Sequence, residues 1–199
     1  MDADDQMCMQ WLMSQPADSR VMEIGLGHGL FTEAIAGRFT EWLGIDGDVA
    51  VVHELSATYG ATRIHQHWLF MDERSMCTEC TEGSWQRLSD QGTPVHTTTI
   101  DAINWSPTVI KMDCEGADFL VCVGAEHTIR DQRPQIWMET WGAWGAERYH
   151  HTAQEFFEFW HDLDYVMHLP SGDAFDPYVW MGATRTPHYN VLCRPRESI

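Results

Sequence analysis

Two neighbouring segments near the start of the chain combine a glycine-rich turn with a carboxylate at the end of a strand. Residues 21–24 (Val-Met-Glu-Ile) read as a buried strand, and residues 25–29 (Gly-Leu-Gly-His-Gly) follow as a turn that opens a helix. Residues 42–46 read as a second strand that ends in Asp46. Glycines let the backbone approach a ligand closely, and a carboxylate at the end of the next strand can accept hydrogen bonds from ribose hydroxyls. These segments therefore predict a nucleoside pocket.

The spacing of the glycines indicates which cofactor the turn would bind. A dinucleotide fingerprint of the form G-x-G-x-x-G needs a third glycine at the position of Leu30. The order found instead, Glu23-x-Gly25-x-Gly27-x-Gly29, resembles the first motif of class I S-adenosylmethionine methyltransferases. A tight strand-to-helix turn that binds no ligand is the alternative explanation for these glycines.

A second group of chemically capable residues lies at the end of a later apolar run. Lys111, Asp113 and Glu115 alternate with other residues there, and the run itself includes Ile110 and Met112. Period-two geometry predicts that the three charged side chains share one face of a strand. The carboxyl ends of strands in an open α/β sheet line the ligand crevice, so these charges should converge on it. The alternative is a structural ion pair between Lys111 and a carboxylate.

The order of elements predicts an α/β fold: a three-layer α/β/α sandwich with a mostly parallel, twisted sheet, Rossmann-like, and an antiparallel edge strand. We expect a single domain over residues 1–199, with an N-terminal helix at 1–15 that covers the sheet edge or the pocket. Residues 71–93 lack periodicity and are expected to form an irregular insertion or lid. The expected helices are 4–14, 28–39, 48–59, 117–130 and one from Thr152; the expected strands are 21–24, 41–46, 61–70, 108–113, 134–139, 165–169 and 189–194; 94–101 is a strand or extended connector and 142–150 a loop.

The charge balance argues against several classes of partner. The chain has 30 acidic residues against 12 Lys and Arg, a formal net charge of −18, and contains no basic run. Such a surface repels phosphate backbones, so a nucleic-acid partner is disfavoured. No stretch is long and apolar enough for a transmembrane helix, and the acidic start of the chain is unlike a signal peptide. We expect a cytoplasmic protein with reduced cysteines and no membrane partner.

Together these segments resemble the FkbM family of S-adenosylmethionine (SAM)-dependent methyltransferases. The resemblance spans roughly residues 21–193, and the most specific stretch is Lys-x-Asp-x-Glu-Gly-Ala at 111–117. The chain departs from the family pattern at Leu26 and His28 in the first motif, and at Asp46-Gly47, where the family usually has Glu-Pro. The other matching stretches are residues 23–29, 99–101, 124–125, 134–139 and 189–192.

The resemblance implies S-adenosyl-L-methionine as the cofactor and assigns it a set of contacts. Segment 65–72 would flank the adenine. The expected cofactor-binding residues are Gly25, Gly27 and Gly29 under the methionine portion, Glu23 near its amino group, Asp46 on the ribose, and the adjacent Leu26 and Gly47. The expected catalytic residues are Asp113 or Glu115 as the group that accepts or positions the acceptor's proton, Lys111 as the residue that tunes their charge, and His28 as a possible base.

The function expected from these residues is O-methylation of a hydroxyl on a small molecule or a sugar-containing metabolite. N-methylation and a non-catalytic SAM-binding module are the alternatives, and a homodimer is possible. An NAD-dependent oxidoreductase is opposed by Leu30.

Three further sites stay open at this stage. Asp113 and Glu139 each end a strand and could hold a divalent metal. A zinc site could form from Cys77, Cys80, His65 and His67. Two tryptophans and two histidines could form an aromatic rim for the acceptor, with packing and helix capping as the alternative; they are Trp141, Trp144, His150 and His151.

Overall fold

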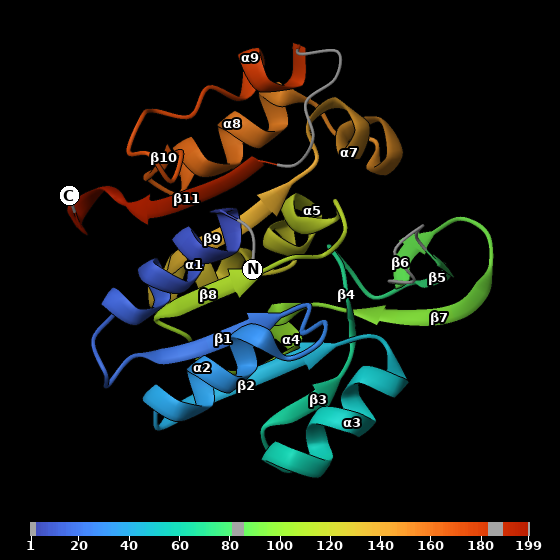
Figure 1. Cartoon of the computed structure of the whole chain (residues 1–199). Coiled ribbons are helices and arrows are strands. Elements are labelled where there is room, and N and C mark those ends of the chain that lie inside the picture. Colours follow the sequence, from blue (N-terminus) through green and yellow to red (C-terminus); the bar gives the residue numbers. More distant parts are fainter. Residues whose placement is uncertain (1–2, 81–85, 183–188, 199) are drawn as a thin grey trace.

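The computed structural model describes residues 3–80, 86–182 and 189–198. Its centre is a seven-stranded sheet in the order β10-β11-β9-β8-β1-β2-β3 (Figure 1). Neighbouring strands from β9 to β3 run parallel, whereas β10 and β11 are antiparallel at one edge. This confirms the predicted sheet. The strands are β1 (Arg20–Ile24), β2 (Glu41–Asp46), β3 (Ile64–Gln66), β8 (Val109–Met112), β9 (Gln135–Thr140), β10 (Tyr165–His168) and β11 (Tyr189–Pro195).

Helices cover both faces of this sheet and complete a three-layer sandwich (Figure 1). One face packs against α1 (Ala3–Ser14), α2 (Leu30–Arg38) and α3 (Val49–Tyr59). The other face packs against α4 (Ile100–Ile103), α5 (Asp118–Val123), α6 (Glu126–Gln132) and α8 (Ala153–Asp162), with α7 (Gly142–Tyr149) and α9 (Pro177–Gly182) beside them. None of the helices in the described ranges is both long enough and apolar enough to span a bilayer.

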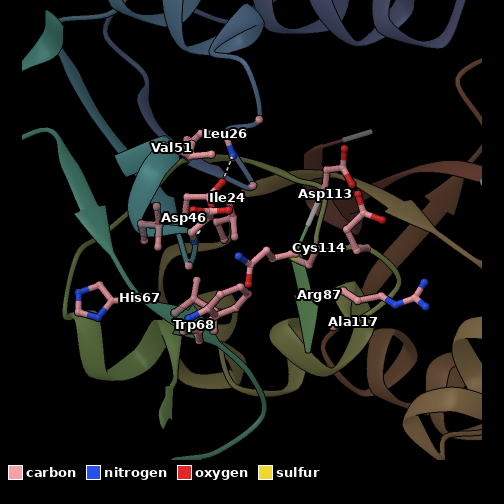
Figure 2. Close-up of a pocket in the computed structure, with 18 of the residues that line it drawn as sticks. Ile24, Leu26, Asp46, Val51, His67, Trp68, Arg87, Asp113, Cys114 and Ala117 are labelled. Atoms are coloured by element: carbon pink, nitrogen blue, oxygen red, sulfur yellow. Dashed lines mark hydrogen bonds between the residues drawn. The ribbon is translucent and has the colours of Figure 1, made fainter. Parts of the chain in front are cut away.

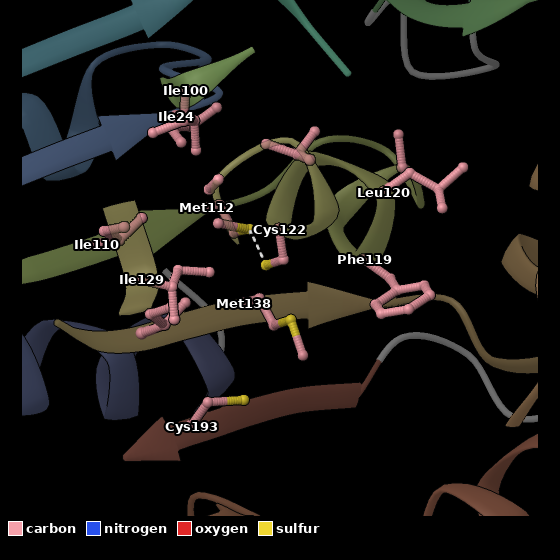
Figure 3. Close-up of a cluster of buried hydrophobic side chains, with 14 of the residues drawn as sticks. Ile24, Ile100, Ile110, Met112, Phe119, Leu120, Cys122, Ile129, Met138 and Cys193 are labelled. Atoms are coloured by element: carbon pink, nitrogen blue, oxygen red, sulfur yellow. Dashed lines mark hydrogen bonds between the residues drawn. The ribbon is translucent and has the colours of Figure 1, made fainter. Parts of the chain in front are cut away.

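The larger core lies under α5 and α6 and fixes the end of β8 (Figure 3). Met112 is fully buried there, and the Cys122 thiol donates to its sulfur at 3.6 Å. Ile110 and Ile129 are equally buried beside them. Because this packing holds β8 to α5, the turn between them has little freedom, and that turn carries the second group of charged residues. All six cysteines are free.

A second, smaller sheet stands beside the carboxyl ends of the main strands (Figure 1). Its order is β4-β7-β5-β6, formed by β4 (Trp68–Leu69), β7 (Thr93–Thr98), β5 (Ser75–Cys80) and β6 (Gln86–Ser89). The prediction that residues 71–93 are irregular was therefore wrong for residues 75–80 and 86–89; residues 81–85 lie outside the described ranges. The expected single strand at 61–70 is divided between the two sheets. Residues 64–66 pair with β2, and the His67 N–H makes a last bond to the Asp46 carbonyl. Residues 68–69 then pair with β7 in the smaller sheet.

Two other predicted elements also differ from the structure. The expected helix at 117–130 breaks at Gly124, where an added Cβ would lie 2.1 Å from the Phe70 carbonyl oxygen. The Gly124 carbonyl accepts the Asp101 N–H rather than continuing a helix. The loop expected at 142–150 is instead α7, since Gly145 lacks a side chain and packs closely against the Gly116 carbonyl.

Candidate functional site

A pocket of about 290 Å³ opens at the carboxyl ends of β1, β2 and β8, where the strand order reverses (Figure 2). This is the place where open α/β sheets bind ligands, and the volume is at the lower end of the range for small-molecule pockets. The pocket contains every predicted cofactor-binding and catalytic residue except Glu23 and Gly29. The predicted residues that line it are Gly25, Leu26, Gly27, His28, Asp46, Gly47, Lys111, Asp113 and Glu115.

The glycine turn forms the floor of the pocket between β1 and α2. Gly25, Gly27 and Gly29 all have positive φ, at 76°, 52° and 77°, a backbone region that side chains disfavour. At Gly25 an added Cβ would lie only 1.9 Å from the carbonyl oxygen of Asp113. The Gly25 N–H also donates to the Ile45 carbonyl at 3.0 Å. The turn is therefore wedged between β2 and the end of β8, and only glycine fits at its first position.

Asp46 connects the second strand to this turn. One oxygen of its carboxylate accepts the Leu26 N–H at 2.8 Å, as Figure 2 shows, and the other accepts the Asp48 N–H at 2.8 Å. Burial raises the pKa of Asp46 above its ordinary value, and the backbone N–H donors oppose that shift. A carboxylate has about four acceptor positions, so Asp46 can still accept ribose hydroxyls from the pocket.

One end of the pocket is apolar and comes from the smaller sheet and α3. His67, Trp68 and Leu69 line it, all within the segment expected to flank the adenine. The Trp68 ring packs directly on Gly47, where an added Cβ would meet it at 2.2 Å. Residues 86–88 of β6 also line the pocket, and Figure 2 shows Arg87 on the side of Ala117, away from His67.

The β6 wall was missed by the sequence analysis, and its position depends on distant contacts. Tyr149 of α7 donates its hydroxyl to the Leu88 carbonyl at 3.1 Å, and Arg148 pairs with Glu79 of β5. Arg87 binds the same Glu79 carboxylate at 3.0 Å. These contacts hold the small sheet against α7. Residues 86–89 show no periodic pattern that could have revealed them.

Lys111 is buried between the turn and the charged residues. Its ammonium donates to the Gly25 carbonyl at 3.2 Å and lies 4.8 Å from the centre of the Phe31 ring. Burial alone would lower the pKa of Lys111, but Asp113 and Glu23 outweigh it and raise that pKa. Lys111 thus fixes the backbone of the glycine turn, and the acidic side chains that act on it electrostatically are those of Asp113 and Glu23.

Glu23 lies beneath the pocket and does not line it. Its side chain is completely buried and accepts the Thr32 hydroxyl at 2.7 Å, which ties β1 to α2. Burial raises the pKa of Glu23 to about 7, opposed by the neighbouring Lys111 and by the Thr32 hydrogen bond. This geometry gives Glu23 a structural position under the turn. The expected contact with the methionine amino group stays a prediction.

Asp113 lies one residue beyond β8, on the same face of the sheet as Lys111. Burial and the adjacent Glu139 carboxyl raise the pKa of Asp113 well above its ordinary value, and Lys111 opposes the shift. Asp113 and Glu139 are hydrogen-bonded to each other, which requires one proton between the two carboxyls. The Trp141 indole N–H also donates to Glu139, at 3.3 Å.

The other two predicted catalytic residues line the pocket in different ways. Glu115 does not continue the alternation of Lys111 and Asp113, because β8 ends at Met112 and Glu115 sits in a turn with a φ of 53°. The prediction that all three share one strand face was therefore wrong for Glu115. His28 is exposed at the mouth of the pocket, in the turn before α2.

A second cavity of about 240 Å³ adjoins the first. The two cavities share Asp5, Phe31, Lys111 and Asp113 in their walls. A bound cofactor and a second small molecule could therefore meet at Asp113.

The sequence of the chain matches the model of the methyltransferase FkbM domain over residues 19–168. The chain belongs to the FkbM methyltransferase family. Membership implies S-adenosyl-L-methionine as the cofactor and methyl transfer as the reaction. Among curated proteins, no match was found.

Solved structures similar to this FkbM-family chain share its fold. A crystal structure of methyltransferase FkbM from Methylobacillus flagellatus KT has a TM-score of 0.53 and 17% identity, covering 88% of this chain and 44% of its own. A TehB-like SAM-dependent methyltransferase from Corynebacterium glutamicum ATCC 13032 Kitasato has a TM-score of 0.54 at 11% identity, covering 98% and 89%. An rRNA methylase from Streptococcus thermophilus has a TM-score of 0.53 at 12% identity, covering 98% of each chain. This chain thus spans less than half of the first relative.

The pocket of this FkbM-family chain fits the cofactor that the family implies. The glycine turn leaves room at its surface for the methionine portion, Asp46 keeps acceptor positions for the ribose, and Trp68 supplies an aromatic wall. In this pocket the nucleoside would lie on the β2 side, beside Asp46, and the methyl group would face the Asp113 side (Figure 2).

The remaining family motif and two of the open sites lie outside the pocket or lack support in the described structure. The Asp101 carboxylate, in the family's Thr-Leu-Asp-like segment, accepts the N–H groups of His127 and Thr128 at the start of α6. Within the described ranges, no group of three or more His, Cys, Asp or Glu side chains could hold a metal ion, so the zinc alternative has no geometric support. The expected aromatic rim, Trp141, Trp144, His150 and His151, lines neither cavity.

Proposed function

We propose that this protein transfers the methyl group of S-adenosylmethionine to a hydroxyl oxygen of a small molecule. The observation that supports this most strongly is the position of Asp113, a half-buried carboxyl group in the walls of both cavities. When bound, the cofactor would supply the methyl group from its sulfonium sulfur, which would become a neutral thioether. Asp113 accepts the proton of the acceptor hydroxyl, which a raised pKa favours because proton transfer is most efficient when the base and the working pH match.

The other residues support this step by position. Lys111 holds the Gly25 carbonyl and so keeps the glycine turn in place under the methionine portion. A nitrogen acceptor is the second candidate, favoured by the carboxyl groups in the adjoining cavity. The proposal also includes a small-molecule partner, a cytoplasmic location and no nucleic-acid or membrane partner. A homodimer is possible within it.

The test is methyl transfer from isotopically labelled SAM to a panel of small alcohols and amines, with products identified by mass spectrometry. We expect a labelled ether, and we expect Asp113→Asn to lower kcat by roughly 100-fold or more while the affinity for SAM changes little. Asp18→Asn, on the exposed segment before β1, is the matched control. Labelled amines alone would favour the second candidate. No product from any acceptor, or full activity of Asp113→Asn, would refute the proposal.

A further inference from the structure

The second cavity has a wall of defined chemistry that the cofactor does not need. It lies between the first turns of α1 and the sheet face formed by the carboxyl ends of β8 and β9 and the amino end of β11. Its volume of about 240 Å³ suffices for a small organic molecule. The lining residues are Asp4, Asp5, Cys8, Phe31, Lys111, Met112, Asp113, Trp137, Glu139 and Asn190.

Strand register explains why polar groups gather on this face. Lys111 pairs with Trp137 across β8 and β9, and Glu139 pairs with Asn190 across β9 and β11. Alternate residues of a strand point to the same side, so these four side chains all point toward α1. The Trp137 indole N–H donates to the Asn190 side-chain oxygen at 2.7 Å, which fixes both.

The charges on the cavity wall do not balance. Four carboxyl groups line it (Asp4, Asp5, Asp113 and Glu139) against one ammonium, that of Lys111, and even with one proton between Asp113 and Glu139 the negative charges outnumber the positive one. Lys111 is already held by the Gly25 carbonyl and the Phe31 ring. The Oδ1 atom of Asp113 is buried and has no hydrogen-bond partner among the described residues. A buried carboxylate oxygen without a donor is costly, and a ligand that brings a donor would relieve that cost.

We propose that this second cavity binds the methyl acceptor and that the acceptor carries an ammonium group in addition to its reacting hydroxyl. The ammonium would lie against Glu139 and Asp4, and the hydroxyl would face Asp113 at the junction with the cofactor pocket. Phe31 and Trp137 supply aromatic surfaces for the carbon skeleton, and aromatic faces also attract cations. An anionic acceptor is disfavoured by the same four carboxyl groups. This inference rests on the proposed function and narrows its class of substrate.

The test uses three probes that share a phenolic hydroxyl and differ in the charge at the other end: tyramine, 4-ethylphenol and 3-(4-hydroxyphenyl)propionate. S-adenosylhomocysteine is first titrated into the protein by calorimetry, and the probes are then titrated with that cofactor product present and absent. We expect tyramine to bind at least tenfold more tightly than 4-ethylphenol, and the propionate to bind most weakly.

Two variants assign the preference to the cavity. Glu139→Gln keeps an acceptor for the Trp141 indole and removes one charge, so the preference for tyramine over 4-ethylphenol should fall at least tenfold. Asp4→Asn changes an exposed residue of α1 that cannot endanger the core, and it should lower the preference by a few-fold. Asp18→Asn lies outside both cavities and should leave the preference unchanged.

The outcomes separate this inference from the proposed function. If S-adenosylhomocysteine does not bind, the proposed function fails, and the probes titrated without it still report on the cavity. If it binds but the three probes bind equally, the propionate binds best, or none binds, the cation inference is overturned. The same holds if Glu139→Gln and Asp4→Asn both retain the full preference for tyramine.

Discussion

The position and protonation of Asp113 depend on where β8 ends. β8 ends at Met112, whose side chain is fixed in the core, and Asp113 follows with its N–H bonded to the Ile24 carbonyl at 3.0 Å. Its backbone is therefore fixed on both sides while its carboxyl faces two cavities. Burial and the Glu139 carboxyl raise its pKa, and Lys111 opposes that shift. The alternation of charges in the sequence predicted that this residue would line the pocket.

Glu23 gives a pH-dependent stability that can be measured. Its pKa in the folded protein is about 7 against an ordinary 4.5, so folding favours the protonated form. The stabilisation is fully present below the ordinary value and is lost as the pH rises through 7. We expect the free energy of unfolding to fall between pH 5 and 8 by roughly 2–3 kcal/mol more in the wild type than in Glu23→Gln. Urea unfolding at both pH values checks this. Glu33→Gln, exposed on α2, should behave as the wild type, and a Glu23→Gln protein with an unchanged pH response would contradict the assignment.

Gly47 and Trp68 are in direct contact at the edge of the pocket. An added Cβ at Gly47 would lie 2.2 Å from the Trp68 ring, so Gly47→Ala must displace a ring that lines the pocket and that we expect to face the adenine. We expect Gly47→Ala and Trp68→Ala each to weaken SAM binding by about tenfold. In the Trp68→Ala background the effect of Gly47→Ala should largely disappear, because residues in contact are not additive. Calorimetry of the four proteins measures the coupling, and strictly additive losses would contradict the contact.

At the scale of elements, the turn after β1 depends on close contact with the end of β8. Gly25→Ala would place a Cβ 1.9 Å from a backbone oxygen, at a φ of 76°, and neither strand can move without breaking the sheet. We expect a loss of roughly 3 kcal/mol or more in the free energy of unfolding.

The control for that substitution is Gly37→Ala. Gly37 lies within α2 with nothing near its added Cβ, so alanine there should stabilise the protein by about 0.5–1 kcal/mol. Thermal and urea unfolding of both variants gives the comparison. Equal changes in the free energy of unfolding at the two glycines would contradict the close contact between Gly25 and the Asp113 carbonyl.

Asp101 belongs to a family motif, but its observed role is structural. Its carboxylate accepts the N–H groups of His127 and Thr128 and the Thr128 hydroxyl, at the start of α6. We expect Asp101→Ala to lower the free energy of unfolding by about 1–2 kcal/mol, as loss of a helix cap does. The affinity for SAM at low temperature should be unchanged. A selective loss of SAM affinity in a protein of normal stability would assign Asp101 to the site instead.

The elements that sequence reasoning missed have weak local signals. β5 alternates poorly between exposed and buried residues, so residues 75–80 show no clear period of two. α7 contains two glycines, which disfavour a helix in isolation, and it forms because Gly145 permits packing on the turn after β8. In contrast, β1, β2 and β8 are continuous buried runs followed by recognisable turns, and their positions were predicted within a residue or two.

At the scale of the whole molecule, the pocket is assembled from segments far apart in the chain. Asp5 of α1, Trp68 of β4 and Leu88 of β6 all line it, together with the turns after β1 and β8. The glycine and acid motifs predicted residues that line the floor of the pocket and its Asp113 side. The β6 wall could not be predicted, because long-range contacts such as Tyr149 with the Leu88 carbonyl place it.

Calorimetric titration of S-adenosylmethionine into the wild-type protein and Asp46→Asn tests the central claim most directly. We predict one cofactor per chain for the wild type and an affinity lower by about tenfold to a hundredfold for Asp46→Asn, because the ribose loses its bonds to a charged acceptor. Asp18→Asn should bind as the wild type. No binding by the wild type, or equal binding by Asp46→Asn, would contradict the claim that the nucleoside lies between the glycine turn and the end of β2.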